Sequence, residues 1–264
     1  MAGRRAAGAV LAAVVWASAP APVAAQDAPA PPAPGTVQVL SRATFHLGAE
    51  KLFSSDRRFR WLVGIGFDLD VVDFGTGRVT LRGDYEAVEG RERRRFDLNQ
   101  GTYVFELSGT RRLGDVELSV FEQHVSRHLV DRENPPAISW NTVGGRVRYE
   151  GGAGVSVELE VGRPWDLALV DYRLVSRLHL AYERPVGSGV TLLAAATGHA
   201  VDGRADDRRK STGGRLQAGL RLAGGAADLE LLASYERRLD AWPTTRGRER
   251  WFGIGFRLVS RPAR

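Results

Sequence analysis

The chain has 264 residues, a formal net charge of +6 and no cysteine. Its basic and acidic residues are spread along the chain and form no single block, so the composition argues against a nucleic-acid-binding protein. Without disulfides, stability has to come from burial and from backbone pairing.

Residues 1–25 predict a signal peptide. They begin with Arg4 and Arg5, continue with an apolar run rich in alanine and valine, and end in Val-Ala-Ala before Gln26, which is the small-residue pattern of a cleavage site. No later stretch has the roughly 18 apolar residues that a membrane-spanning helix needs. Residues 26–35 are rich in proline and alanine and predict an extended periplasmic lead-in. Residues 36–264 are expected to form one domain.

Apolar and polar residues alternate in one stretch after another from residue 36 onwards, which predicts β-strands with one apolar and one polar face. Twelve strands are expected, at 36–48, 58–73, 77–89, 99–112, 115–130, 139–150, 154–164, 170–185, 188–200, 212–223, 227–238 and 248–260. Single-chain bacterial outer-membrane barrels have even strand numbers and spanning strands of about 9–11 residues. The pattern therefore predicts an all-β fold, a closed, up-and-down, twelve-stranded antiparallel transmembrane β-barrel.

The links between the expected strands alternate in length. The even-numbered links are tight and rich in glycine, whereas the odd-numbered links are long and polar. Outer-membrane barrels combine short periplasmic turns with longer external loops. The alternation predicts a barrel in a Gram-negative outer membrane with both mature termini in the periplasm.

The alternation also assigns each side chain to a face of the barrel. The side chains expected to face lipid include Ile65, Leu81, Leu178, Leu220, Leu231 and Ile254. The side chains expected in the lumen include Arg82, Glu158, Arg177 and Glu230. Acids and bases are interleaved on the lumenal face, so we expect ion pairs there, because unpaired charge is costly inside a protein.

Aromatic residues near the strand ends are assigned in the same way. In the strand at 170–185, Tyr172 is expected to point outward and Arg173 inward. Tryptophans near the external strand ends predict half of an aromatic girdle at the membrane surface. They are Trp61, Trp140, Trp165 and Trp251, with Trp242 in the last external loop.

The expected strand at 115–130 departs from the pattern. Val116, Leu118 and Val120 define an outward face, and the same parity continues with Glu122, His124, Ser126 and His128, which we call the polar row. An unbroken strand turns the polar row toward lipid, whereas a bulge between Val120 and Glu122 turns it into the lumen. We favour the bulge, because lipid exposure of a carboxylate and two imidazoles costs free energy, and Val125 and Leu129 are apolar outward replacements.

The segment around the polar row carries a resemblance to known proteins. It reads His124-x-Ser126-x-His128-Leu129-x-Asp131-x-Glu133 and resembles a signature of uncharacterised bacterial outer-membrane barrels, with Arg127, Val130 and the inserted Arg132 as departures. His124-x-Ser126 is also similar to the His-x-Ser of the outer-membrane lipid A deacylases, whose motif continues with asparagine where Arg127 stands. The second resemblance implies a serine nucleophile directed at the outer leaflet.

Three roles are open for this segment. In acyl-ester hydrolysis, Ser126 is the nucleophile, His124 the base, and Glu122 or Glu133 orients the imidazole. In lipopolysaccharide recognition, the ligand-binding residues are Arg127, His128, Asp131 and Arg132, together with other arginines at the rim such as Arg93, Arg94 and Arg95. In the third, the side chains join the lumenal polar network. No metal site is expected, because positions along one strand are too far apart for a tetrahedral site.

No glycine-rich phosphate loop, zinc-ligand spacing or nucleotide fingerprint occurs, so no cofactor is expected. Gly253, Phe256 and Leu258 resemble the C-terminal signal recognised by the barrel-assembly machinery, which is therefore an expected partner beside outer-membrane lipids and lipopolysaccharide. The favoured function is a structural barrel or a narrow channel for a small solute, with a polar, charged lumen. The alternative is a lipid A or phospholipid ester hydrolase with its site at the rim. A wide pore is disfavoured, because such pores have about 16–18 strands.

Overall fold

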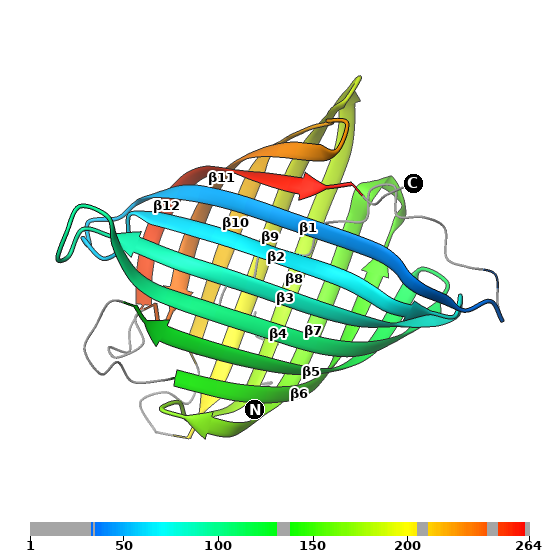
Figure 1. Cartoon of the computed structure of the whole chain (residues 1–264), viewed down its shortest axis with the longest axis horizontal. Helices are drawn as coiled ribbons and strands as arrows, with labels where there is room; N and C mark the ends of the chain where they lie inside the picture. The colour runs from blue at the N-terminus through cyan, green and yellow to red at the C-terminus, as the bar shows by residue number, and fades with distance from the viewer. Residues whose placement is uncertain (1–32, 34, 131–137, 205–210, 242–247, 262–264) are drawn as a thin grey trace, which may run out of the picture.

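Twelve antiparallel strands close into a barrel (Figure 1). The computed structural model describes residues 33, 35–130, 138–204, 211–241 and 248–261. The strands are β1 (Gln38–Phe53), β2 (Trp61–Asp73), β3 (Gly77–Gly90), β4 (Asp97–Leu113), β5 (Val116–Leu129), β6 (Ile138–Glu150), β7 (Val155–Ala168), β8 (Tyr172–Gly187), β9 (Val190–Gly203), β10 (Ser211–Leu222), β11 (Ala227–Leu239) and β12 (Arg248–Ser260), with a short 3-10 helix, η1 (Gly152–Gly154), before β7. Each strand pairs with its neighbours in sequence, and β1 pairs with β12. The predicted fold class is confirmed, and each expected strand overlaps an observed one.

The two ends of the barrel differ in their links. The links at 74–76, 114–115, 188–189 and 223–226 are tight and lie at the end where β1 begins and β12 ends. The strand ends joined by the longer links, between β1 and β2, β3 and β4, β5 and β6, β9 and β10, and β11 and β12, lie at the opposite end, which we call the long-link end. The seventh link is an exception to the expected length pattern, because it is odd-numbered but short. It covers only residues 169–171, since β7 ends at Ala168 and β8 begins at Tyr172.

Parts of the chain with sequence-based predictions lie outside the described residues. They include the predicted signal peptide at 1–25, most of the lead-in at 26–35, and Trp242. Within the described part, no helix has the length and apolar character needed to cross a membrane.

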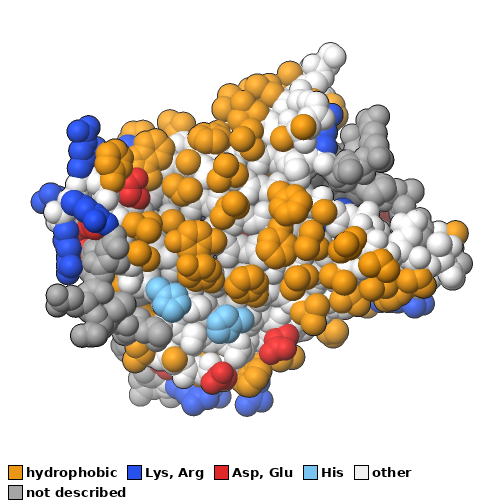
Figure 2. Space-filling view, in the orientation of Figure 1, with side chains coloured by type: hydrophobic (Ala, Val, Ile, Leu, Met, Phe, Trp, Pro, Cys, Tyr) orange, Lys and Arg blue, Asp and Glu red, His pale blue; other side chains and the backbone are white. Residues whose placement is uncertain are grey.

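On the side of the barrel that Figure 2 shows, hydrophobic side chains cover much of the outer face, with some histidine and acidic side chains among them. Ile65 is 54% exposed and Ile254 is 51% exposed, and Leu220 and Leu231 are also exposed. Leu81 is partly covered but lies on the same face, opposite the exposed Leu107 of β4. These and the other exposed apolar side chains form an apolar belt around the strands, as expected of a lipid-facing surface.

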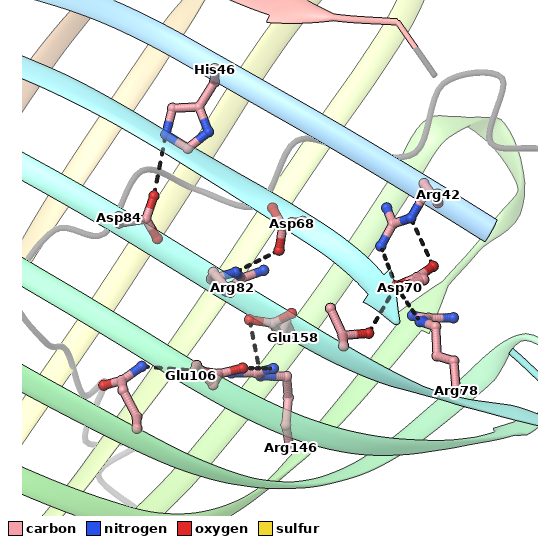
Figure 3. Close-up of polar contacts among 12 residues, drawn as sticks. Arg42, His46, Asp68, Asp70, Arg78, Arg82, Asp84, Glu106, Arg146 and Glu158 are labelled. Atoms are coloured by element: carbon pink, nitrogen blue, oxygen red, sulfur yellow. Dashed lines mark hydrogen bonds and ion pairs between the residues drawn. The ribbon is translucent and has the colours of Figure 1, made fainter. Parts of the chain in front are cut away.

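The inner face carries charged side chains that pair with one another (Figure 3). Arg146 donates to both Glu106 and Glu160 at 2.7 Å, and Arg177 donates to Glu158 at 2.9 Å. Further ion pairs join Arg82 to Asp68 and Arg42 to Asp70, and the His46 Nε2 lies 3.2 Å from the Asp84 Oδ1. Opposite charges in contact offset much of the cost of taking them out of water.

At the long-link end, apolar side chains also pack inside the barrel, beside buried polar ones such as Asn99, Arg127 and Arg238. One buried cluster contains Leu52, Phe59, Leu62, Val88, Leu129, Ala241 and Trp251. A second contains Val104, Val125, Ile138, Trp140, Tyr172, Val175 and Val201. Phe59 is 0% exposed, although it lies in the link between β1 and β2. The link therefore folds its phenyl ring into the mouth of the barrel.

Some predicted side-chain directions are wrong at this end. Trp140 and Trp251 are buried in the lumenal clusters and do not form a girdle, whereas Trp165 is 49% exposed. The register of β8 against β9 shifts between Tyr172 and Leu174. The shift turns Tyr172 inward, where its hydroxyl donates to Asp240 at 2.7 Å, and leaves Arg173 exposed.

Candidate functional site

β5 has no bulge, so the favoured prediction for the polar row is wrong. β5 pairs residue by residue with β4 from Val116 to Leu129, and with β6 from Val116 to Arg127. Glu122 and His124 are exposed on the outer face, and Ser126 and His128 are partly exposed there. Histidine side chains are visible among hydrophobic ones in Figure 2.

The reason lies on the inner face of the same strand. Val125 is 1% exposed and packs in the cluster with Trp140, and Leu129 packs in the cluster with Phe59. Apolar clusters fill part of the lumen at this height, beside the buried Arg127, and they take up Val125 and Leu129. The polar row is left on the outer surface, close to the long-link end.

The neighbouring strands place outward side chains on both sides of the polar row. On β4, Tyr103 lies opposite Ser126, Phe105 opposite His124 and Leu107 opposite Glu122. On β6, Ser139 lies opposite Ser126 and Asn141 opposite His124. Ser126 therefore has an aromatic neighbour on one side and a hydroxyl on the other.

Two hydrogen bonds organise the polar row. The Ser126 Oγ and the His128 Nε2 are 2.6 Å apart. The His124 Nδ1 and the Asn141 Oδ1 are 2.7 Å apart. Same-face neighbours on a strand are about 6.6–6.8 Å apart, so the Ser126 hydroxyl stands between two imidazoles, one on each side along β5.

Asn141 also contacts β7. Its Nδ2 donates to the Asp166 Oδ2 at 3.1 Å. The register of β6 against β7 shifts here, because Asn141 pairs with Trp165 whereas Ser139 pairs with Ala168. Asp166 has a φ of +49°, a left-handed conformation that aspartate adopts more readily than most residues. The resulting bulge leaves both Trp165 and Asp166 on the exposed surface.

The group that contacts the His124 imidazole differs from the predicted one. Glu122 was predicted to orient the ring, but the atom beside His124 Nδ1 is the Oδ1 of Asn141. Glu122 lies opposite Leu107 and Val143. Asp131, Arg132 and Glu133 lie outside the described residues.

Arg127 was predicted as a phosphate ligand at the rim, and this prediction is wrong. Its side chain is 6% exposed, points into the lumen, and donates to the backbone oxygen of Asp240 at 3.2 Å. Its guanidinium also lies 5.3 Å from the centre of the Trp140 ring. Arg93, Arg94 and Arg95 are exposed in the link between β3 and β4. Among the described residues, no group of three or more acidic or histidine side chains is arranged to hold a metal ion.

Sequence reasoning missed Asn141 and Asp166. Asn141 has a usable signal: it has outward parity on the strand after the polar row, and pairing the two strands across their link brings it beside His124. Asp166 has none, because it lies beyond residue 164, where the seventh strand was expected to end, and because a bulge reverses its direction.

Comparison with solved structures identifies proteins with a similar fold. No protein-family model and no curated protein matches the sequence. The outer membrane phospholipase A of Escherichia coli superposes with a TM-score of 0.55 at 12% identity, over 81% of this chain and 95% of that one. The outer membrane phospholipase of Salmonella typhi, solved as a dimer with bound calcium, gives a TM-score of 0.54 at 12% identity, over 86% and 93%. A form of the E. coli protein with an active-site asparagine replaced by alanine gives a TM-score of 0.53 at 12% identity, over 81% and 89%. This chain therefore has the fold of an outer-membrane β-barrel.

Proposed function

We propose that this protein is an outer-membrane serine hydrolase that cleaves acyl ester bonds of phospholipids. Ser126 is the nucleophile, His124 the general base, and Asn141 the group that orients His124. The observation that carries the proposal is the position of the Ser126 hydroxyl, which lies on the outer face of the barrel between two imidazoles, one of them held by Asn141.

The hydrogen bonds define the chemistry. With the His124 Nδ1–H donating to the Asn141 Oδ1, the Nε2 lone pair is free to accept a proton. Rotation of the Ser126 side chain about χ1 moves its hydroxyl from His128 toward His124. The observed bond to His128 then holds the hydroxyl at rest, and the catalytic contact forms when substrate binds.

The reaction proceeds through an acyl-enzyme. The Ser126 oxygen forms a bond to the ester carbonyl carbon while its proton passes to His124. The bond from that carbon to the glycerol oxygen breaks, and His124 returns the proton to the leaving alkoxide. Water then repeats the sequence on the acyl-enzyme and releases a fatty acid.

The site faces the region where lipid esters lie. The polar row is near the long-link end, which is the external end of the barrel if both termini are periplasmic and residues 1–25 direct export. Tyr103 and Phe105 flank the polar row and are 42% and 49% exposed, so acyl chains can pack against them. A lipid in the outer leaflet can therefore approach Ser126 sideways from the membrane.

The function that the sequence favoured, a structural barrel or a narrow channel, has less support than the hydrolase. Buried apolar clusters occupy the lumen at the long-link end, and ion pairs cross it further along. The likeness of the fold to two outer membrane phospholipases adds weight to the hydrolase, and the E. coli protein has an asparagine in its active site, as is proposed here for Asn141. Outer-membrane lipids are then substrate and surroundings, and the barrel-assembly machinery remains a proposed partner.

The test is fatty-acid release by the purified full-length protein in mixed micelles of detergent and diacyl phospholipid, detected by mass spectrometry. Ser126→Ala should abolish release, whereas Ser139→Ala, which removes the hydroxyl directly opposite on β6, should retain most of it. Parallel samples contain calcium or a chelator, because the Salmonella protein was solved with calcium. Release of fatty acid from lipid A and not from phospholipid would change the proposed substrate to lipid A. No release from either lipid would refute the proposed hydrolase function.

A further inference from the structure

We infer that Asp166 is a positioning residue, which fixes the side-chain amide of Asn141 and through it selects the tautomer of His124. The catalytic consequence rests on the proposed function, but the tautomer itself does not. The observation is a continuous chain of hydrogen bonds on the outer surface, from His124 on β5 through Asn141 on β6 to Asp166 on β7.

The direction of this chain follows from which atoms can donate. An ionised carboxylate only accepts hydrogen bonds, so the Asn141 amide must turn its NH2 group toward Asp166. Its oxygen then faces His124, and the His124 nitrogen beside it, Nδ1, must carry the proton. The other ring nitrogen, Nε2, is left with a lone pair on the face that carries Ser126.

Without Asp166, nothing in this chain of hydrogen bonds fixes the orientation of the Asn141 amide. An asparagine amide can rotate by 180° and exchange its oxygen with its NH2 group at little steric cost. A rotated Asn141 presents a donor to His124 Nδ1, which then has to accept, and the ring proton moves to Nε2. In that tautomer His124 cannot take a proton from Ser126.

The backbone of β7 supports a specific placement of Asp166. Trp165 pairs with Asn141 and shares its outward parity, so regular alternation would turn Asp166 into the lumen. The bulge and the positive φ of Asp166 bring its carboxylate to the outer surface instead. Asparagine is also tolerated in this conformation, so Asp166→Asn keeps the backbone and the shape while removing the charge.

The first experiment reads the tautomer directly. Full-length protein with 15N-labelled histidine is studied by NMR in detergent micelles, and His124→Gln identifies the His124 signals. The wild-type ring should be protonated at Nδ1, and Asp166→Ala should shift the population toward the Nε2-protonated form. Asp166→Asn should fall between them, since its amide oxygen can still accept from Asn141. Asp115→Asn, at an exposed turn between β4 and β5, is the matched control and should leave the spectrum unchanged.

The second experiment exchanges the two groups. Asn141→Asp alone places two carboxylates side by side and should lower kcat about 100-fold, a loss comparable to that of a misplaced catalytic group. Adding Asp166→Asn restores a donor next to an acceptor with the His124 tautomer unchanged, and should bring kcat back to within about tenfold of wild type. Throughout, KM should change less than kcat, because Asp166 is assigned no contact with substrate.

The outcomes separate this inference from the proposed function. An Nδ1-protonated His124 in Asp166→Ala overturns the inference even if the protein hydrolyses lipid. A double variant no more active than Asn141→Asp also overturns it, because a purely structural role would make the two losses add. If the wild-type protein hydrolyses no lipid, the proposed function fails, and the tautomer measurement still decides the role of Asp166.

Discussion

Asn141 of β6 lies directly opposite His124 of β5, and its Oδ1 is 2.7 Å from the His124 Nδ1. Both side chains face outward, among the polar side chains that interrupt the apolar outer face here. Polar groups on a lipid-facing surface cost free energy, because lipid offers them no hydrogen bonds, and such groups commonly mark a functional site. The pair therefore marks the part of the barrel where function is to be sought.

The two histidines of the polar row should differ in their effect on catalysis. His124→Ala removes the oriented base and should lower kcat about 100- to 10,000-fold, the usual contribution of general acid–base catalysis. His128→Ala removes only the partner that holds the Ser126 hydroxyl at rest, and should lower kcat less than about tenfold. Both are measured by fatty-acid release. The reverse order of losses would make His128 the base.

Arg146 should be a centre of barrel stability. It is buried and pairs with Glu106 and Glu160, so Arg146→Met leaves buried carboxylates without their main partner and should cost about 3–5 kcal/mol. The measurement is urea unfolding of the barrel in lipid vesicles. Arg148→Met is the control: its partner Glu150 has a side chain that is 51% exposed, and exposed pairs contribute about 0–1 kcal/mol. Equal losses in the two variants would contradict the lumenal network.

The fold was predictable from the sequence because the alternation of apolar and polar residues within each strand shows which side chains share a face. Alternation from Trp61 to Asp70, or from Arg248 to Leu258, needs no knowledge of the neighbouring strands. Unbroken alternation from Val116 also gives the observed direction of the polar row. The bulge was favoured because of the cost of polar side chains at the lipid surface, and that argument could not take into account what fills the lumen at the same height. Trp140 and Phe59 belong to the apolar clusters that take up Val125 and Leu129, and they come from β6 and from the link before β2. A bulge such as the one at Asp166 leaves no mark in the alternation.

The outward register of β12 can be tested by a single substitution. Ile254 is 51% exposed on the outer face, so Ile254→Arg brings a charge into the apolar belt and should cost about 2–4 kcal/mol near the bilayer midplane. Ile254→Leu keeps an apolar side chain of similar volume and should change the free energy of unfolding by less than about 1.5 kcal/mol. Assembly is followed by the heat-dependent gel shift of folded barrels. An Ile254→Arg barrel that assembles as well as wild type would place this position in the lumen.

Glu122 provides the test of the polar row itself. It is exposed and lies between Leu107 and Val143, whose exposed fractions are 53% and 54%, so its carboxylate stands in the apolar belt. Glu122→Leu should therefore stabilise the barrel, by up to about 2 kcal/mol given that acidic residues cost less there than the 2–4 kcal/mol of basic ones. Activity should be retained, because His124 is oriented by Asn141 and not by Glu122. Urea unfolding and fatty-acid release are measured on the same preparation. Destabilisation would place Glu122 among the lumenal charges, as the bulged register requires, whereas loss of activity with stability retained would restore Glu122 as the group that orients the imidazole.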